Sequence, residues 1–261
     1  MTREMRSPET GRWLGLVWTL IRTDFKTRYH GTVGGFVWAL LKPAAMFVVL
    51  LSVFSLVFSN ARTYSLDLIV GLFLWDYFSE STKVGLTTLH AKGYLLSKAR
   101  FPAWVLVVSS ISNALITSLV FSVVTLVYLT VSHGAPPPPR AIVWFAVYLL
   151  SLVLITIGFS LASSVLFLRY RDLNQVWEVV LQVGFFVAPI VYPLSVIPER
   201  IHRFLYFWPP TPIIQFSRAV LIEGVVPTAR AHASLALLVI TSLAIGAAIY
   251  RRLAPRAAEY L

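Results

Sequence analysis

The chain has 261 residues, of which 57% are hydrophobic and 13% are charged. This composition is typical of helical proteins that cross a membrane several times, and it excludes an ordinary soluble domain. The net charge of +11 comes from basic residues between apolar runs, which indicates membrane orientation and lipid contact, not nucleic-acid binding. The absence of cysteine excludes disulfides and thiol chemistry, and five scattered histidines predict no metal site.

The first predicted element is an amphipathic helix over residues 13–28, within a segment 11–32 that we expect to lie on the membrane surface. Its apolar face repeats at helical spacing. The opposite face is basic and carries Arg12, Arg22 and Lys26. Such a helix lies along the interface and does not cross the bilayer.

Six apolar runs are each close to the length that a bilayer requires. They cover residues 37–58, 66–84, 104–131, 142–168, 174–191 and 234–250. The sequence therefore predicts an all-α membrane protein with six transmembrane helices. With the N-terminus inside, basic residues are in excess on the cytoplasmic side, so both termini are expected there. Four prolines at 136–139 predict a stiff connector.

The region between the fifth and sixth spans predicts a hairpin. Residues 198–207 and 212–223, within a region 194–231, are helix-compatible but too short to cross, and they predict a re-entrant hairpin in the outer leaflet. The alternative is an ordinary surface loop.

Residues 91–101 form a basic amphipathic segment on the cytoplasmic side. It is either a solvated loop or a stiff contact for a cytoplasmic motor.

Polar residues recur at helical spacing in the second and fifth spans. Because the two spans run in opposite directions, we expect Lys83 and Glu178 to pair. The stripes either hold helices together or line a translocation path. Their members are Asp76, Glu80, Lys83, Arg171, Gln175, Glu178 and Gln182.

Aromatic side chains are dense along the first two spans. Aromatic rings stack on the apolar faces of sugars, so these side chains are candidates for lining a glycan conduit. The alternative is packing against lipid and other helices. The candidates are Trp38, Phe47, Phe54, Phe58, Phe73, Trp75, Tyr77 and Phe78.

Neither a Gly-x-x-x-x-Gly-Lys-Ser/Thr phosphate cradle nor a Gly-x-Ser-x-Gly nucleophile motif occurs in the sequence. Energy for transport would therefore come from another chain or from an ion gradient. An ion-coupled transporter would use the acids Asp76, Glu80 and Glu178. A membrane-embedded transferase would have only Asp67, Glu199 and Glu223 on its outer segments.

In combination and in this order, these features resemble the permease subunit of ATP-binding-cassette exporters of polysaccharides, such as the O-antigen and teichoic acid permeases. The resemblance covers nearly the whole chain as one permease domain, 1–261. It is carried by residues 24–43, 169–172, 188–193 and 251–261.

The resemblance implies a homodimer, two copies of a separate ATPase that binds ATP and Mg, and export of a lipid-linked glycan across the bacterial inner membrane. The chain itself would be no enzyme and hold no cofactor or metal. Relatives that export drugs or small lipids share this plan.

The resemblance also implies site residues. ATPase contacts would be Lys92, Tyr94, Leu95, Lys98, Arg100, Arg12, Arg22 and Lys26. The outer gate would comprise Arg200, Arg203, Trp208, Arg218 and Glu223.

Overall fold

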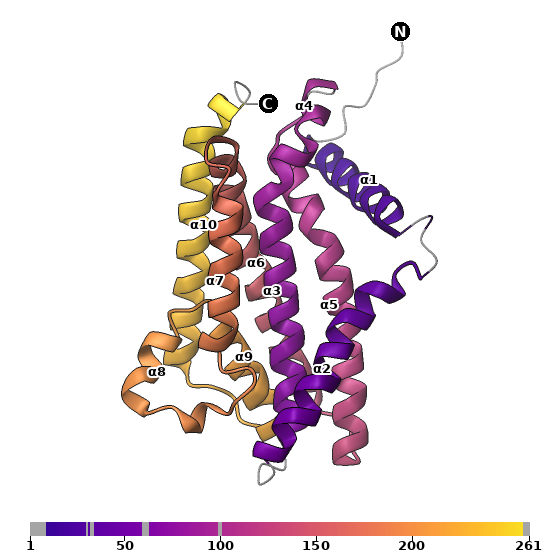
Figure 1. Ribbon diagram of the computed structural model, residues 1–261. Coiled ribbons are helices and arrows are strands. Elements are labelled where there is room, and N and C mark those ends of the chain that lie inside the picture. The colour runs from indigo at the N-terminus through magenta and orange to yellow at the C-terminus, as the bar shows by residue number, and fades with distance from the viewer. Residues whose placement is uncertain (1–8, 30, 32–33, 59–62, 99–100, 258–261) are drawn as a thin grey trace.

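The structure is a computed structural model that describes residues 9–29, 31, 34–58, 63–98 and 101–257. These residues build a helical bundle, with no strand among them. Figure 1 shows α4 and the C-terminal part of α10 at one end of the bundle, and α8 and α9 at the other. The helices are α1 (Glu9–Tyr29), α2 (Val37–Val57), α3 (Tyr64–Lys92), α4 (Tyr94–Lys98), α5 (Trp104–His133), α6 (Pro139–Arg169), α7 (Leu173–Val187), α8 (Glu199–Leu205), α9 (Pro210–Arg218) and α10 (Ala229–Ala257).

All six predicted spans are helical, but they are not equivalent. Among the described residues, α2, α5, α6 and α10 are the helices long and apolar enough to cross a membrane. Helix α3 has 29 residues but contains several charged side chains, and α7 has only 15 residues. The structure therefore confirms four of the six predicted spans as membrane-spanning by length and composition.

Helix α7 is shorter than predicted because a proline fixes its end. The sequence predicted a span to Val191, whereas the helix ends at Val187. Ala188 has an extended backbone with ψ of 125°. The ring of Pro189 disfavours helical geometry at the residue before it, so the helix cannot continue. Helix α10, in contrast, begins five residues before the predicted span and runs past its predicted end.

Helix α3 lies at the centre of the bundle (Figure 1), where it contacts α2, α5, α6, α7 and α9. Most of its apolar side chains are buried, including Leu68, Leu86 and Leu89 with no exposed surface. A helix with charged residues is costly in contact with lipid, so enclosure by neighbouring helices is the arrangement that the membrane favours.

Helices α6 and α10 approach closely through small residues. A Cβ placed on Gly246 would lie 2.1 Å from the carbonyl oxygen of Gly158, and one on Gly158 would lie 2.6 Å from the carbonyl oxygen of Ser242. Only glycine allows the two backbones to come this near. Small residues at such crossings are the usual means of helix association in membranes.

The two short helices of the predicted hairpin differ in burial. Helix α8 is mostly exposed, whereas α9 is buried against α3 and α6, with Ile213 and Ile214 fully enclosed. A π-helical turn, Ala219–Glu223, follows α9 and ends at Gly224, which has a positive φ of 69°. Two short helices are therefore present in the predicted region, with bounds that differ from the predicted ones, and α9 is the one that packs into the bundle.

Arg218, at the end of α9, holds the hairpin in place. Its side chain is buried, and the guanidinium donates to the carbonyl oxygens of Asp67 at 2.6 and 2.9 Å, Pro189 at 2.6 Å and Ile190 at 3.0 Å. The carboxylate of Asp67 lies 3.7 Å from Nε. A Cβ on Gly71 would lie 2.7 Å from Nη2, so glycine there permits the approach. One side chain thus joins α3, α9 and the break after α7.

We expect Arg218→Met to destabilise the folded protein by roughly 3 kcal/mol or more, because it leaves buried carbonyl groups without donors. Arg218→Lys should be intermediate, since an ammonium cannot reproduce the planar fork of donors. Arg140→Met, at an exposed arginine in the first turn of α6, is the matched control. Melting of purified protein in detergent measures the effect, and equal melting temperatures for Arg218→Met and Arg140→Met would contradict it.

We expect Gly246→Ala to cost roughly 1–3 kcal/mol, because the added methyl group meets the backbone of α6 and the helices must separate. Gly15→Ala is the control: its Cβ would meet nothing within 4 Å, so it should leave stability unchanged or slightly raised. The same melting measurement separates them. A Gly246→Ala protein as stable as wild type would show that the α6–α10 contact is loose.

Candidate functional site

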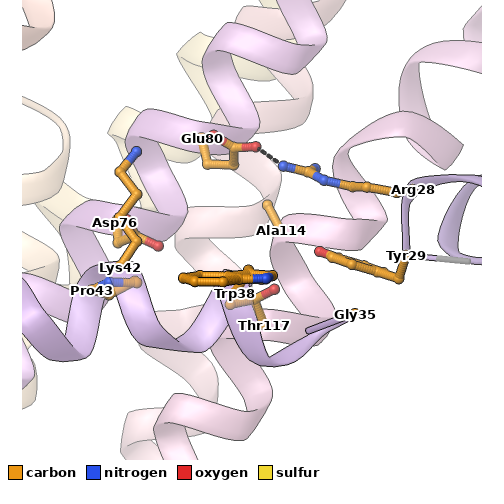
Figure 2. A pocket seen from close by; sticks show the side chains of 11 residues that line it. Arg28, Tyr29, Gly35, Trp38, Lys42, Pro43, Asp76, Glu80, Ala114 and Thr117 are labelled. Atoms are coloured by element: carbon orange, nitrogen blue, oxygen red, sulfur yellow. Dashed lines mark hydrogen bonds and ion pairs between the residues drawn. The ribbon is translucent and has the colours of Figure 1, made fainter. Parts of the chain in front are cut away.

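The candidate site is a pocket where α1, α2, α3 and α5 meet, with a cavity volume of about 310 Å³. Figure 2 shows side chains from these helices converging on it. It lies where the end of α1 meets the middle of α3. Its lining residues are Arg28, Tyr29, Gly35, Trp38, Ala39, Lys42, Pro43, Asp76, Glu80, Ala114 and Thr117.

Charges of both signs face one another in this pocket. The guanidinium of Arg28 on α1 lies 2.5 Å from the carboxylate of Glu80 on α3. Burial disfavours the charged guanidinium, but the hydrogen bond and charge of Glu80 outweigh it and raise the pKa of Arg28. Asp76 lies one turn before Glu80, and Lys42 projects beside it (Figure 2). Two cations and two carboxylates therefore leave the pocket with no formal net charge.

An aromatic surface forms another wall of the pocket. Trp38 is 62% exposed, and its indole lies between Lys42 and Tyr29 in Figure 2. A Cβ on Gly34 would lie 2.2 Å from the indole nitrogen, so glycine makes room for the ring in this position. The ring face thus stays available to a molecule in the cavity.

This combination suits a neutral molecule with many hydroxyl groups. Carboxylates accept hydrogen bonds from hydroxyls, and the ammonium and guanidinium groups donate them. An aromatic face stacks on the apolar face of a ring. A polyanion would meet Asp76 and Glu80 as repelling charges, whereas a purely apolar molecule would leave all four charged groups without partners.

The predicted conduit aromatics fall into three groups. Trp38 faces the pocket. Phe47 and Phe54 on α2, and Phe58 directly after it, are half-buried against the bundle. The α3 members Phe73, Trp75, Tyr77 and Phe78 are buried inside the protomer, at most 7% exposed. Within one protomer, Trp38 is therefore the conduit candidate that is placed to touch a ligand.

The structure does not bring the two polar stripes together within the protomer. Asp76 and Glu80 face α1 and α2, whereas Gln175, Glu178 and Gln182 are exposed on α7 and Arg171 is exposed just before that helix begins. The expected Lys83–Glu178 pair is wrong, because neither residue takes part in an ion pair within the part of the chain that the structure describes. Trp177 faces α3 instead: its indole nitrogen donates to Thr82 at 3.1 Å, which turns Glu178 outward.

The predicted motor-contact segment is a short helix, α4, that follows α3 after one residue. Tyr94 is 58% exposed, and the ammonium of Lys98 lies 5.5 Å from its ring centre. Leu95 is half-buried against an apolar cluster that contains Leu89 and Leu106. Leu95 therefore anchors the segment while Tyr94 faces outward. Arg100 lies outside the described residues, as does the side chain of Arg12.

Helix α1 is tied to this end of the bundle by Lys92. Its ammonium forms an ion pair with Asp24 and donates to Ser110 at 2.8 Å. Lys92 is thus half-buried between α1 and α5 and takes a structural position. Arg22 and Lys26 are exposed on α1. The predicted contact residues are therefore split between the exterior and the interior of the bundle.

The predicted gate residues also separate into two groups. Arg218 is buried, and Trp208 lies half-buried among aromatic rings, 5.8 Å from Phe78 and 6.4 Å from Trp177 between ring centres. A Cβ on Gly184 would lie 2.4 Å from the Trp208 indole, so α7 receives this ring at a glycine. The remaining three, Arg200, Arg203 and Glu223, are exposed.

Sequence reasoning did not assign Arg28, Tyr29 or Lys42 to a site. Arg28 and Glu80 are 52 positions apart, so no local spacing signals that they meet. The available signal was the unusual position of Lys42 next to Pro43 near the beginning of an apolar span. A charge there has to be paired, exposed at the interface or functional.

Comparison with known proteins identifies the chain's relatives. Residues 15–222 match the family model of the ABC-2 type transporter. An O-antigen export system permease protein of Myxococcus xanthus is 30% identical, covering 87% of this chain and 88% of the relative. One of Klebsiella pneumoniae is 27% identical, covering 96% of both chains. A polysialic acid transport protein of Escherichia coli is 22% identical, covering 89% of this chain and 91% of the relative. The chain belongs to the ABC-2 type transporter membrane family.

Proposed function

We propose that this chain is the transmembrane subunit of an ATP-driven exporter that moves a lipid-linked polysaccharide across the bacterial inner membrane. The observation that carries the proposal is the similarity, over nearly the full length of both chains, to permeases named for O-antigen export and polysialic acid transport. The chain acts as a transport component, with ATP and Mg bound by a separate ATPase subunit.

The proposed topology has six crossings, with α3 and α7 added to the four apolar spans. Enclosure by neighbouring helices supports α3 as a crossing despite its charges. Helix α7 is short, but the chain after it continues to α8 at the end opposite α4, which supports a crossing. The packing of α9 against α3 and α6 supports a re-entrant hairpin on that side. Six crossings place both termini on one side, and the excess of basic residues at the α4 end makes that side cytoplasmic.

The proposed assembly is a homodimer with two ATPase subunits. Helix α7 supports it, because Gln175, Glu178 and Gln182 form an exposed polar stripe on a helix next to the membrane core. Such groups are costly against lipid. A second copy of the chain, or a water-filled path between two copies, would give them partners.

The pocket at Trp38 is the proposed contact of the cytoplasmic mouth with the glycan. Stacking on the indole tolerates different sugars, while the surrounding carboxylates and cations offer hydrogen bonds without a net charge. The pocket opens beside the end of α1, which supplies Arg28 and Tyr29. A sugar there would contact α2 and α3 as it enters the membrane-spanning part.

We expect Trp38→Ala to lower glycan export roughly three- to tenfold without reducing the amount of folded protein, because an exposed stacking face is lost. Trp38→Phe should retain most export. Trp18→Ala, at a similarly exposed tryptophan of α1 outside the pocket, is the control. Surface glycan per folded permease measures the effect. Wild-type export by Trp38→Ala, with an active Trp18→Ala control, would remove the pocket from the glycan path.

We expect Tyr94→Ala to lower export while the co-purified ATPase continues to hydrolyse ATP, because the aromatic contact area at the proposed joint is lost. The permease alone should hydrolyse no ATP. Tyr170→Ala changes a half-exposed tyrosine at the same end of the bundle and is the control. ATP turnover and export are measured in the same reconstituted vesicles. Unchanged export per ATP in Tyr94→Ala would place the joint elsewhere.

A further inference from the structure

A second cavity lies at the opposite end of the bundle from α4, between α8, α9 and α10, with a volume of about 380 Å³. This volume falls in the range of sites for small organic ligands. Its walls are mainly apolar and include Phe207, Pro212, Leu235 and Leu238. The cavity shares no residue with the pocket at Trp38 and was not anticipated from the sequence.

The cavity is continuous with a surface that faces the membrane. Leu237, which is 63% exposed, lines the cavity, and Ile240 continues the same exposed apolar surface of α10. Phe207 is 79% exposed at the opposite edge. Since α10 is an apolar span, this surface contacts lipid chains, and a chain lying along α10 can enter the groove sideways.

One cation stands at the mouth of the groove. Arg203 is the charged residue among those that line it, and within the described parts of the chain it takes part in no ion pair. Arg200 lies three residues earlier on α8 and is also exposed. Glu199, four residues before Arg203, is exposed too and offsets part of this charge. The charge of Glu223 also acts on Tyr206, which lines the groove, so Arg200 and Arg203 are balanced by two carboxylates nearby. The attraction for an anion therefore comes from Arg203 itself, the charged residue that lines the groove.

We propose that this groove binds an anionic phospholipid from the leaflet at the α8 end. One acyl chain lies between Phe207 and the α10 residues Leu235 and Leu238, and the phosphate accepts hydrogen bonds from Arg203. Apolar walls alone would accept any lipid, so the cation supplies the preference for a negative headgroup. A bound chain joins α8 to α10 and thereby stabilises the part of the hairpin that the bundle leaves exposed.

The test is native mass spectrometry of the full-length, delipidated protein titrated with phosphatidylglycerol and with phosphatidylcholine. We expect phosphatidylglycerol to bind about fivefold more tightly, since one basic residue near a lipid surface contributes about 1 kcal/mol. Arg203→Gln should remove this preference, so that the two lipids bind about equally. Glu199→Gln should increase the preference for phosphatidylglycerol. Arg140→Gln, at an exposed arginine where α6 begins, is the control and should keep the preference.

The apolar part is tested by filling the groove. Thr241 lines it from an exposed position, so Thr241→Trp should block binding of both lipids without disturbing the fold. Leu150→Trp, at an exposed leucine of α6, is the control for added bulk. Equal binding of the two lipids to wild type, or full binding by a folded Thr241→Trp protein, would overturn the proposal. So would a loss of dimer on Thr241→Trp, because the groove would then receive a second copy.

Discussion

The hydrogen bonds of the Arg218 guanidinium are the interactions on which the α8 end of the molecule depends. Pro189 ends α7 inside the bundle, and a helix that ends there leaves carbonyl groups without donors. Arg218 donates to Pro189 and Ile190 after the break and also to Asp67 in the first turn of α3. The buried carbonyl groups of Pro189, Ile190 and Asp67 need hydrogen-bond donors, and the guanidinium of Arg218 supplies them. Helix α9 can enter the bundle because this one side chain satisfies the irregular backbone that follows α7.

A related constraint explains the position of the pocket at Trp38. The charges of α3 are kept from lipid by the surrounding helices, but Asp76 and Glu80 still need partners or water. Helix α1 brings Arg28 to Glu80, and α2 brings Lys42 beside Asp76. The pocket is the space that remains where these four charged groups meet. Its mixed charge thus follows from how the two acids in the middle of α3 are accommodated.

The sequence predicts where helices occur along the chain, but it does not predict which face of each helix meets which neighbouring helix. Helix positions follow from local features: apolar runs, prolines and a basic amphipathic repeat each act within a few residues. Facing directions depend on which neighbour is present, and a helix that is apolar nearly all round gives no local signal of it. Glu178 was predicted to meet α3, but Trp177, one position earlier, takes that place by donating to Thr82. For the same reason Phe73 and Tyr77 are core residues in the protomer, and the Arg28–Glu80 contact was not foreseen.

The mixed roles of the basic residues near α4 have a physical basis in how α1 is attached. Asp24 and Arg28 lie one turn apart on α1, and they bind Lys92 and Glu80, which both belong to α3. Lys92 also donates to Ser110 of α5, so α1, α3 and α5 share one polar junction. Helix α4 begins two residues after Lys92 and is held by Leu95 in the apolar cluster beside it. Helix α3 carries Asp76 and Glu80 in the pocket at Trp38 and leads directly into α4. Tyr94 and the pocket are therefore connected through a single helix.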